Sequence, residues 1–308
     1  MIGKKLRVIW LKKLTKLILF FCIIIPGLVL GALSPIQSIT PFKNVQGRYN
    51  CVAFTISKFG KIYLVNEANN QIYLIDKDGA VRNSAGGYGW GQNLFNTPVD
   101  ITTRNGLNFY IADYNNRRIV RYDKQLNYIG EMGKAYEFYP LSVEVSRFSR
   151  LYILDDDQDR VLHFGSKKEL ISIIGGNEYD KFNIHNPIDM EITKNGLLIL
   201  EKSRILIFDR RGTPQNVFNL DMKIADGSIS FIENNYLITD EKSKQIYIIK
   251  QNNTNQNTIG LLGIRDKERI TDCEIKQAKI YILTSSGRIL YYQKSELLRS
   301  FKKEDVSH

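Results

Sequence analysis

FNTPVDITTRNGLNFYIADYNNRRIVRYD, residues 95–123, is the stretch that decides the fold. It contains two short runs of β-branched and aromatic residues, FYIAD and IVRYD, with the turn residues Asn115 and Asn116 between them. Asn105-Gly106, a frequent turn dipeptide, precedes the first run. Short β-rich runs separated by turn residues predict antiparallel strands joined by tight hairpins.

The FYIAD run recurs along the chain. Its copies begin at residues 62, 109, 151, 197, 236 and 280, so successive copies lie 39 to 47 residues apart. Each copy is followed by a short polar turn and a second run of the same kind, as in RVLHF and RILIF. A weaker run precedes each pair and another follows it, for example VDITT and YIGEM in the second copy. The repeating unit is therefore a meander of four short antiparallel strands.

This unit and this period predict an all-β fold, a six-bladed β-propeller of four-stranded antiparallel blades over residues 48–301. A β-solenoid is the main alternative, but its repeat is usually shorter and its strands are parallel. In the propeller scheme ELLRSF, residues 296–301, is the outer strand of the last blade. No exchange of strands between the two ends of the chain is evident from the sequence.

Blade 2 carries the residues by which the chain resembles a known family. GGYGWGQNLFNTPVDI, FYIADYNNRRIVRYD and NYIGEMG follow one another there, and parts of the pattern return in blades 3 and 4. In these residues the chain is similar to the NHL-repeat propellers, while blades 5 and 6 keep mainly the spacing. The resemblance implies the fold and says little about function, because one fold serves many functions.

The positive charge is concentrated at the start of the chain. The formal net charge is +11, but residues 1–16 hold six Lys and Arg and no acid, so 11 − 6 leaves +5 for the remainder. A domain of that size with +5 is only mildly basic, so we expect no nucleic acid as a partner.

An apolar segment, residues 17–33, follows this basic lead and holds no charged residue. The combination predicts a signal peptide or a membrane anchor with one transmembrane helix, and large residues at the possible cleavage sites favour the anchor. The positive-inside rule then places the propeller outside the cytoplasmic membrane, single-pass at the cell membrane or secreted if the segment is cleaved. We expect a linker over 34–47 and a polar tail over 302–308.

Three aspartates occupy corresponding positions on the inner strands of alternate blades: Asp100, Asp189 and Asp272. Inner strands line the channel of a propeller, so the three carboxylates can converge there and bind Ca²⁺ or a cationic ligand. The alternative is that each aspartate caps its own turn by accepting a backbone N–H. Three glutamates lie two residues after the corresponding position on their strands, and they add to the acidity of the channel: Glu144, Glu191 and Glu274.

The NHL-like resemblance also implies an enzyme hypothesis. Some propellers of this kind are lyases with a histidine-bound zinc, and related sugar lactonases hold Ca²⁺ with acids in the channel. The chain has only His163, His185 and His308, which argues against a three-histidine site. It also lacks the GxSxG, GxxxxGK[ST] and CxxC motifs.

Aromatic residues mark the links between blades, and they suggest a rim that binds a peptide or glycan. The candidate ligand-binding residues are Tyr88, Trp90, Tyr136 and Tyr179. Packing between blades is the alternative role for these side chains. We expect Trp90 to be the most exposed of the four.

Cys51 and Cys273 fall on the inner strands of blades 1 and 6, which are neighbours in a closed ring. A disulfide between them would join the ends of the propeller and stabilise it by about 3–5 kcal/mol, because it constrains the unfolded chain. Two buried free thiols are the alternative, since cysteine packs well as a small apolar residue.

These observations favour a non-enzymatic binding scaffold outside the membrane that recognises a protein, peptide or glycan. The alternative is a hydrolase, lactonase or lyase that depends on Ca²⁺ in the channel.

Overall fold

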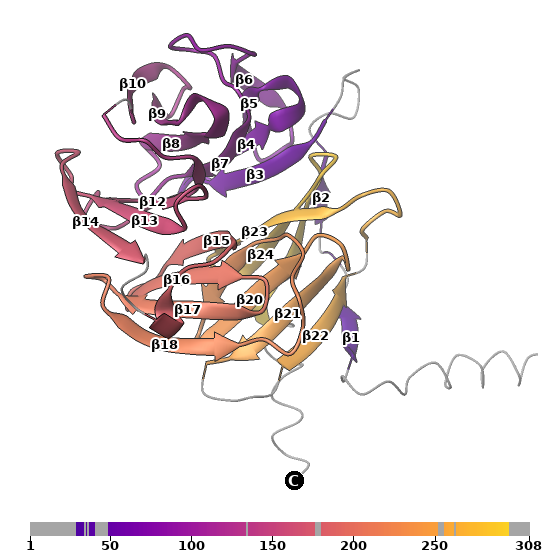
Figure 1. Cartoon of the computed structure of the whole chain (residues 1–308). Helices are drawn as coiled ribbons and strands as arrows, with labels where there is room; N and C mark the ends of the chain where they lie inside the picture. Colours follow the sequence, from indigo (N-terminus) through magenta and orange to yellow (C-terminus); the bar gives the residue numbers. More distant parts are fainter. Residues whose placement is uncertain are drawn as a thin grey trace, which may run out of the picture.

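The computed structural model describes residues 29–33, 35, 37–40, 49–133, 135–175, 180–251, 256–261 and 263–295. They form six small antiparallel sheets, which Figure 1 shows as separate fans of strands. The innermost strand of each sheet contacts the innermost strand of the next, and the last contacts the first, so the six sheets close into a ring. The six-bladed β-propeller predicted from the repeat is confirmed.

The strands of the first three blades run from the channel outward in chain order. Blade 1 contains β3 (Cys51–Ile56), β4 (Ile62–Asn66), β5 (Gln71–Ile75) and β6 (Val81–Gly86). Blade 2 contains β7 (Pro98–Thr102), β8 (Asn108–Asp113), β9 (Arg118–Asp123) and β10 (Tyr128–Met132). Blade 3 contains β11 (Pro140–Val145), β12 (Leu151–Asp155), β13 (Arg160–Phe164) and β14 (Leu170–Gly175).

The remaining blades follow the same plan. Blade 4 contains β15 (Pro187–Ile192), β16 (Gly196–Glu201), β17 (Arg204–Asp209) and β18 (Pro214–Asn219). Blade 5 contains β19 (Ile229–Ile232), β20 (Asn235–Asp240), β21 (Gln245–Lys250) and β22 (Gln256–Leu261). Blade 6 contains β23 (Ile270–Lys276), β24 (Lys279–Thr284) and β25 (Ile289–Gln293). Three short 3₁₀ helices lie in loops: η1 (Glu67–Asn69), η2 (Tyr114–Asn116) and η3 (Asp180–Phe182).

The outer strand of blade 6 comes from the other end of the chain. It is β2 (Gln37–Ile39), which pairs antiparallel with β25 and sets Ser38 opposite Leu290. The expectation that the ends exchange no strand was therefore wrong, because the strand that closes the ring has three residues and no repeat pattern of its own. Residues 296–301, expected in this position, lie outside the described residues.

A further strand, β1 (Val29–Leu33), pairs in parallel with β22 and becomes the fifth strand of blade 5. The end of the apolar segment 17–33 thus lies on the propeller, and residues 1–28 are outside the described part. Within the described part, no helix has the length and apolar character needed to cross a membrane. The anchor or signal remains a prediction.

The hydrophobic core is divided into clusters between neighbouring blades. Between blades 1 and 2, for example, Tyr63 and Val65 pack against Phe109 and Ile111, and the rings of Tyr63 and Phe109 stack with centroids 3.7 Å apart. Each sheet therefore buries both of its faces against its neighbours. This explains why the second strand of each blade is a continuous apolar run rather than an alternating one.

The polar residue that ends the second strand has the same task in five blades. Its side-chain oxygen accepts the backbone N–H of the connector that enters its own blade, at 2.8–3.2 Å. The acceptors are Asn66, Asp113, Asp155, Glu201 and Asp240. This repetition identifies the group as part of the scaffold.

Candidate functional site

The meander gives the ring two different faces. The turns that join the first to the second strand and the third to the fourth strand of each blade lie on one face, which we call the turn face; residues 146–150 and 209–213 are examples. The connectors between blades and the turns between the second and third strands lie on the other, the connector face; residues 87–97 and 114–117 are examples. The central channel runs between the two faces.

Asp100, Asp189 and Asp272 all lie at the channel, as predicted from their positions on β7, β15 and β23. Each carboxylate accepts the backbone N–H of an inner strand in the next blade. The donors are Val143 at 2.7 Å for Asp100, Ile229 at 2.9 Å for Asp189 and Phe54 at 3.0 Å for Asp272. The three aspartates thus join blade 2 to 3, blade 4 to 5 and blade 6 to 1.

Ser142 connects two of these carboxylates. Its hydroxyl lies 3.0 Å from Oδ2 of Asp100 and 3.1 Å from Oδ1 of Asp189. In the described part, no group of three His, Cys, Asp or Glu side chains is arranged to hold a metal ion. Asp100 and Asp272 also accept the N–H of the residue that follows each of them, at 2.6 Å. The oxygen atoms considered for Ca²⁺ therefore bind backbone N–H groups, mainly across the gap between blades rather than within a local turn.

Burial changes the charge of the channel. Burial, together with the charge of Asp100, raises the pKa of Asp189 to about 7. Burial and the nearby carboxylates of Asp189 and Glu274 raise the pKa of Glu191 to about 8. Burial also holds the pKa of Glu144 well above its ordinary value. The channel therefore keeps several of its carboxyl groups protonated near neutral pH, and its negative charge is smaller than its composition implies.

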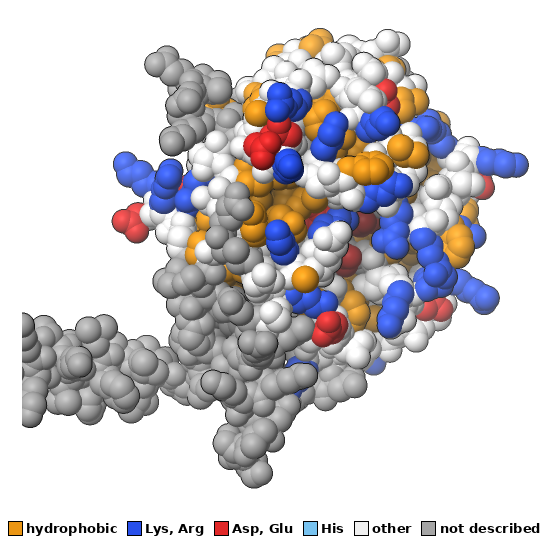
Figure 2. Space-filling view, turned by 180° about the vertical axis from the view of Figure 1, so that it is seen from behind, with side chains coloured by type: hydrophobic (Ala, Val, Ile, Leu, Met, Phe, Trp, Pro, Cys, Tyr) orange, Lys and Arg blue, Asp and Glu red, His pale blue; other side chains and the backbone are white. Residues whose placement is uncertain are grey.

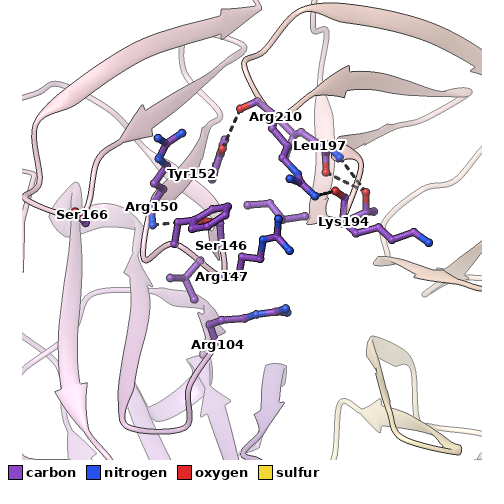
Figure 3. Close-up of a pocket in the computed structure, with 14 residues that line it drawn as sticks. Arg104, Ser146, Arg147, Arg150, Tyr152, Ser166, Lys194, Leu197 and Arg210 are labelled. Carbon is purple, nitrogen blue, oxygen red and sulfur yellow. Dashed lines mark hydrogen bonds between the residues drawn. The ribbon is translucent and has the colours of Figure 1, made fainter.

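The second feature of the site is basic. Lys and Arg side chains are spread widely over the surface drawn in Figure 2, whereas Asp and Glu lie at a few places. On the turn face, between blades 3 and 4, a pocket of about 400 Å³ opens beside the channel. Its basic lining residues come from four turns: Arg104, Arg147, Arg150, Lys194 and Arg210. Figure 3 shows the guanidinium groups of Arg104, Arg147 and Arg210 around the middle of the pocket.

The rest of the lining is apolar or carries hydroxyl groups. Phe148 is 58% exposed and Tyr152 and Leu197 form a wall behind it, while Ser146, Ser166 and Thr193 supply hydroxyls. None of the described lining residues is Asp or Glu, and none of the five basic side chains forms an ion pair with a described acid.

Neutral groups fix the position of the basic side chains. The Arg210 guanidinium donates to the backbone carbonyl of Lys194, and the Arg147 guanidinium lies 4.7 Å from the centre of the Phe148 ring. The Tyr152 hydroxyl donates to the Arg210 carbonyl at 3.3 Å. These partners carry no negative charge. Arg104 also lines the acidic channel, where its charge acts to lower the pKa of Glu191, so the uncompensated positive charge is that of the other four basic residues.

The candidate aromatic rim is divided. Tyr88 and Trp90 are 64% and 68% exposed on the connector face, and their rings meet edge to face with centroids 5.6 Å apart. Tyr136, on the connector between blades 2 and 3, packs its ring against Phe164 of blade 3, with centroids 5.1 Å apart. Tyr179 lies outside the described residues. Trp90 is the most exposed of the three candidates that the structure describes. Tyr88 and Trp90 do not share a face with the basic pocket, and their role in binding remains a prediction.

Cys51 and Cys273 are free thiols in the structure, unlike the disulfide considered from the sequence. Cys51 packs in a cluster between blades 1 and 6, next to Leu283 and Ile289. Cys273 packs between blades 5 and 6, next to Ile232. The prediction that the two cysteines lie on adjacent inner strands was correct, but their side chains lie on opposite sides of blade 6. That sheet separates them.

The histidines form no zinc site among the described residues. His163 is buried in blade 3, where its ring stacks on Tyr152 with centroids 4.2 Å apart and burial lowers its pKa. His185 is exposed on the connector between blades 3 and 4. Its backbone N–H binds Glu201 at 2.8 Å.

The basic pocket was missed in the sequence. Its residues lie far apart along the chain and the overall charge is only mildly basic, so no local run marks it. The available signal was positional, because all five basic residues fall in the turns that the meander assigns to one face. A count of the charged residues in the turns of each face would have indicated the basic pocket.

Comparisons with known proteins place the chain by its fold. No family model matches it, and no curated protein matches it. Among solved structures it is similar to a catalytically inactive histidine-to-alanine variant of virginiamycin B lyase from Staphylococcus aureus with quinupristin, at 13% identity and a TM-score of 0.59, covering 83% of this chain and 98% of that chain.

Two further lyase structures give the same result. A streptogramin B lyase matches at 15% identity with a TM-score of 0.61, over 80% of each chain. A selenomethionine-substituted virginiamycin B lyase from Staphylococcus aureus matches at 12% identity with a TM-score of 0.60, covering 83% of this chain and 98% of that chain. At such identities the likeness concerns the fold, so the chain is a six-bladed propeller of the architecture that these lyases share.

Proposed function

We propose that this chain is a non-enzymatic binding scaffold outside the cytoplasmic membrane that holds an anionic ligand in the basic pocket. The observation that carries the proposal is the pocket of about 400 Å³ whose five basic side chains face no acid among its described lining residues. The ligand is a protein, peptide or glycan that carries carboxylate, phosphate or sulfate groups.

Electrostatics favours an anion at this position. Like charges held close together repel one another, and a bound anion removes that repulsion. Guanidinium groups also match the planar oxygen pairs of carboxylates and phosphates, to which they donate two parallel hydrogen bonds. Arg104, Arg147 and Arg210 supply three such groups to one space (Figure 3). Phe148 and Leu197 offer an apolar surface to the body of the same ligand.

The pocket has few means of catalysis. Its described lining residues include no His, Cys, Asp or Glu that would activate a serine hydroxyl. Ser146 accepts the backbone N–H of Arg150 at 3.2 Å, which is a structural contact in a turn. We therefore favour binding over reaction.

The location outside the membrane rests on the sequence. Residues 1–16 are basic, and the apolar segment 17–33 follows. Its last five residues form β1 at the edge of blade 5, so residues 17–28 are left for the proposed anchor or signal. Identification of the N-terminal residue of the native protein, together with its partition between membrane and soluble fractions, tests the anchor and its cleavage.

Binding of small anions tests the proposed function directly. Pyrophosphate and citrate are titrated into the purified chain by calorimetry and by thermal shift, since a ligand of the native state raises the melting temperature. We expect Arg147→Ala with Arg210→Ala to weaken binding by roughly tenfold or more, because each charge-assisted hydrogen bond contributes about 1.5–3 kcal/mol. The matched control is Lys58→Ala with Lys77→Ala, on turns of blade 1. The absence of binding, or equal losses in both variants, would refute the proposal.

An enzyme is the second candidate. It is favoured by the likeness to lyase structures and by Glu144 and Glu191, whose raised pKa values suit proton transfer beside the pocket. Incubation with quinupristin, with and without Ca²⁺, followed by liquid chromatography and tandem mass spectrometry, separates the two candidates. A new product, either an isomer of unchanged mass or one with water added, that Glu191→Gln abolishes would favour the enzyme over the scaffold.

A further inference from the structure

The lining of the basic pocket combines three kinds of group. Arg104 and Arg147 bring positive charge, Ser146 and Ser166 bring hydroxyls, and Phe148 offers an exposed ring face. Hydroxyls donate to and accept from other hydroxyls, and an exposed ring stacks on the apolar face of a sugar. The set therefore matches a ligand with acidic groups, several hydroxyls and a flat apolar face.

The positive charge continues outside the pocket on the adjoining turns. Lys167 and Lys168 follow Ser166 in the turn between β13 and β14, where the exposed Glu169 comes next and offsets one of the two charges. Arg211 follows Arg210 in the turn between β17 and β18. All three outer residues are exposed. A small anion bound in the pocket does not reach these outer charges. A chain of repeating anionic units that extends out of the pocket would contact them.

An acid on one of the same turns is already occupied. Asp209 accepts the backbone N–H groups of Arg211 and Thr213 at 2.8 and 2.9 Å, and these hydrogen bonds lower its pKa although burial acts in the opposite direction. Its carboxylate closes the turn in which Arg211 lies by accepting backbone N–H groups, and the charge of Arg211 also acts on it, so Arg211 is partly compensated.

Resting on the proposed function, we infer that the ligand is an acidic glycan, a chain of sugar residues with carboxylate, sulfate or phosphate groups. One sugar occupies the pocket against Phe148, with its acid at Arg104, Arg147 and Arg210. The following sugars run across the turn face over Lys167, Lys168 and Arg211. A volume of about 400 Å³ is at the lower end of small-ligand sites, so most of the chain stays outside.

A single-stranded nucleic acid shares the repeating charge but needs a different surface. Proteins that bind it without sequence preference offer a series of aromatic rings on which successive bases stack. At this pocket only Phe148 presents an exposed ring among the described lining residues, with Tyr152 buried behind it. The hydroxyl groups and the single ring favour sugars over bases.

The test compares ligands of increasing length on the purified full chain. The probes are glucuronic acid and hyaluronan oligosaccharides of two to ten sugars, with neutral dextran as the uncharged control and oligo-dT as the nucleic-acid control. We expect the affinity to rise at least tenfold from the single sugar to the longest oligosaccharide. We also expect its dependence on salt to become steeper as more charges are neutralised.

Two sets of variants locate the chain. Arg147→Ala should weaken the single sugar and the oligosaccharides alike. Lys167→Ala, Lys168→Ala and Arg211→Ala combined should leave the single sugar unchanged and remove most of the gain with length. Lys58→Ala, Lys61→Ala and Lys77→Ala remove the same charge from blade 1 and should change neither.

The outcomes are distinguishable. Oligosaccharides that bind no better than glucuronic acid, or oligo-dT that binds more tightly than both, would overturn the acidic glycan but leave an anion-binding scaffold in place. If pyrophosphate, citrate, glucuronic acid and the oligosaccharides all fail to bind, the proposed function fails as well.

Discussion

Replacement of Arg118 tests how strongly one buried side chain holds blade 2 together. Arg118 begins β9 and is 5% exposed. Its guanidinium donates to the carboxylates of Asp113 and Glu131 at 2.8 and 2.5 Å. It also donates to the carbonyls of Gly91 and Leu94, at 2.9 and 2.6 Å. One side chain thus links the second, third and fourth strands of the blade to the connector that carries Trp90.

The magnitude follows from what remains after the change. Arg118→Met keeps the apolar stem but leaves the carboxylate of Asp113, whose side chain has no exposed surface, without its cation. Removal of one partner of a buried ion pair costs about 3–5 kcal/mol. Glu131 is 14% exposed and is hydrated more easily, so it adds little. We expect the free energy of unfolding to fall by about 3–5 kcal/mol.

Urea unfolding followed by circular dichroism measures this loss. With a slope of about 3 kcal/mol per molar urea, the midpoint should fall by roughly 1 M or more. Arg117→Ala is the matched control: Arg117 is exposed, contacts the Tyr139 ring at 4.4 Å, and should change stability little. Asp113→Asn added to Arg118→Met should restore part of the loss, because it removes the unpaired charge. If Arg118→Met and Arg117→Ala lie within 1 kcal/mol of one another, the reasoning is refuted.

Three further predictions concern the channel, the closure of the ring and the thiols. Asp189 and Glu191 have pKa values raised to about 7 and about 8, so between about pH 4 and 8 the native state holds protons that the unfolded chain has released. The contribution of these two groups to the free energy of unfolding should therefore be largest below about pH 4, fall by up to about 1.4 kcal/mol per pH unit for each group as the pH rises, and be lost above about pH 8. Glu191→Gln should reduce the change in melting temperature between pH 5.5 and 8.5. A variant profile as steep as the parent's contradicts this. Removal of residues 1–40 takes away β1 and β2 and leaves β25 as an open sheet edge, so this chain should melt lower and aggregate in size-exclusion chromatography. Removal of residues 1–36 takes away β1 alone and should not do so; equal behaviour of the two truncated chains would count against closure by β2. In the chain without residues 1–28, Cys51 and Cys273 should be silent to a thiol reagent when native and both react after unfolding without reductant; fewer than two reactive thiols would mean that they are bonded.

The blades could be predicted from the sequence because each repeats the same physical solution. A sheet buried on both faces needs apolar second and third strands. Pairs of apolar runs, such as FYIAD followed by RIVRYD, occur six times along the chain and mark these strands. The position of Asp100, Asp189 and Asp272 at the channel followed from the same pattern. Their partners did not, because Val143, Ile229 and Phe54 donate through backbone N–H groups that leave no mark on residue type.

The remaining features depend on contacts between distant parts of the chain. β2 has three residues and becomes a strand by pairing with β25, so the local sequence pattern does not predict it. Arg104 and Arg210 lie more than a hundred residues apart and meet only because successive turns share a face. The disulfide considered for the two cysteines is absent for a related reason. Their strands are adjacent as predicted, but the two side chains lie on opposite sides of blade 6, so the sulfur atoms do not meet.

The pairing of β2 with β25 has a consequence for synthesis. Residues 37–39 leave the ribosome long before residues 289–293, so the early strand waits without a partner while five blades are built. Until β2 and β25 pair, the folding chain has an exposed strand edge at blade 6 that can pair with other chains. Completion of the ring therefore depends on a contact between the two ends of the chain, which we expect to form late in folding.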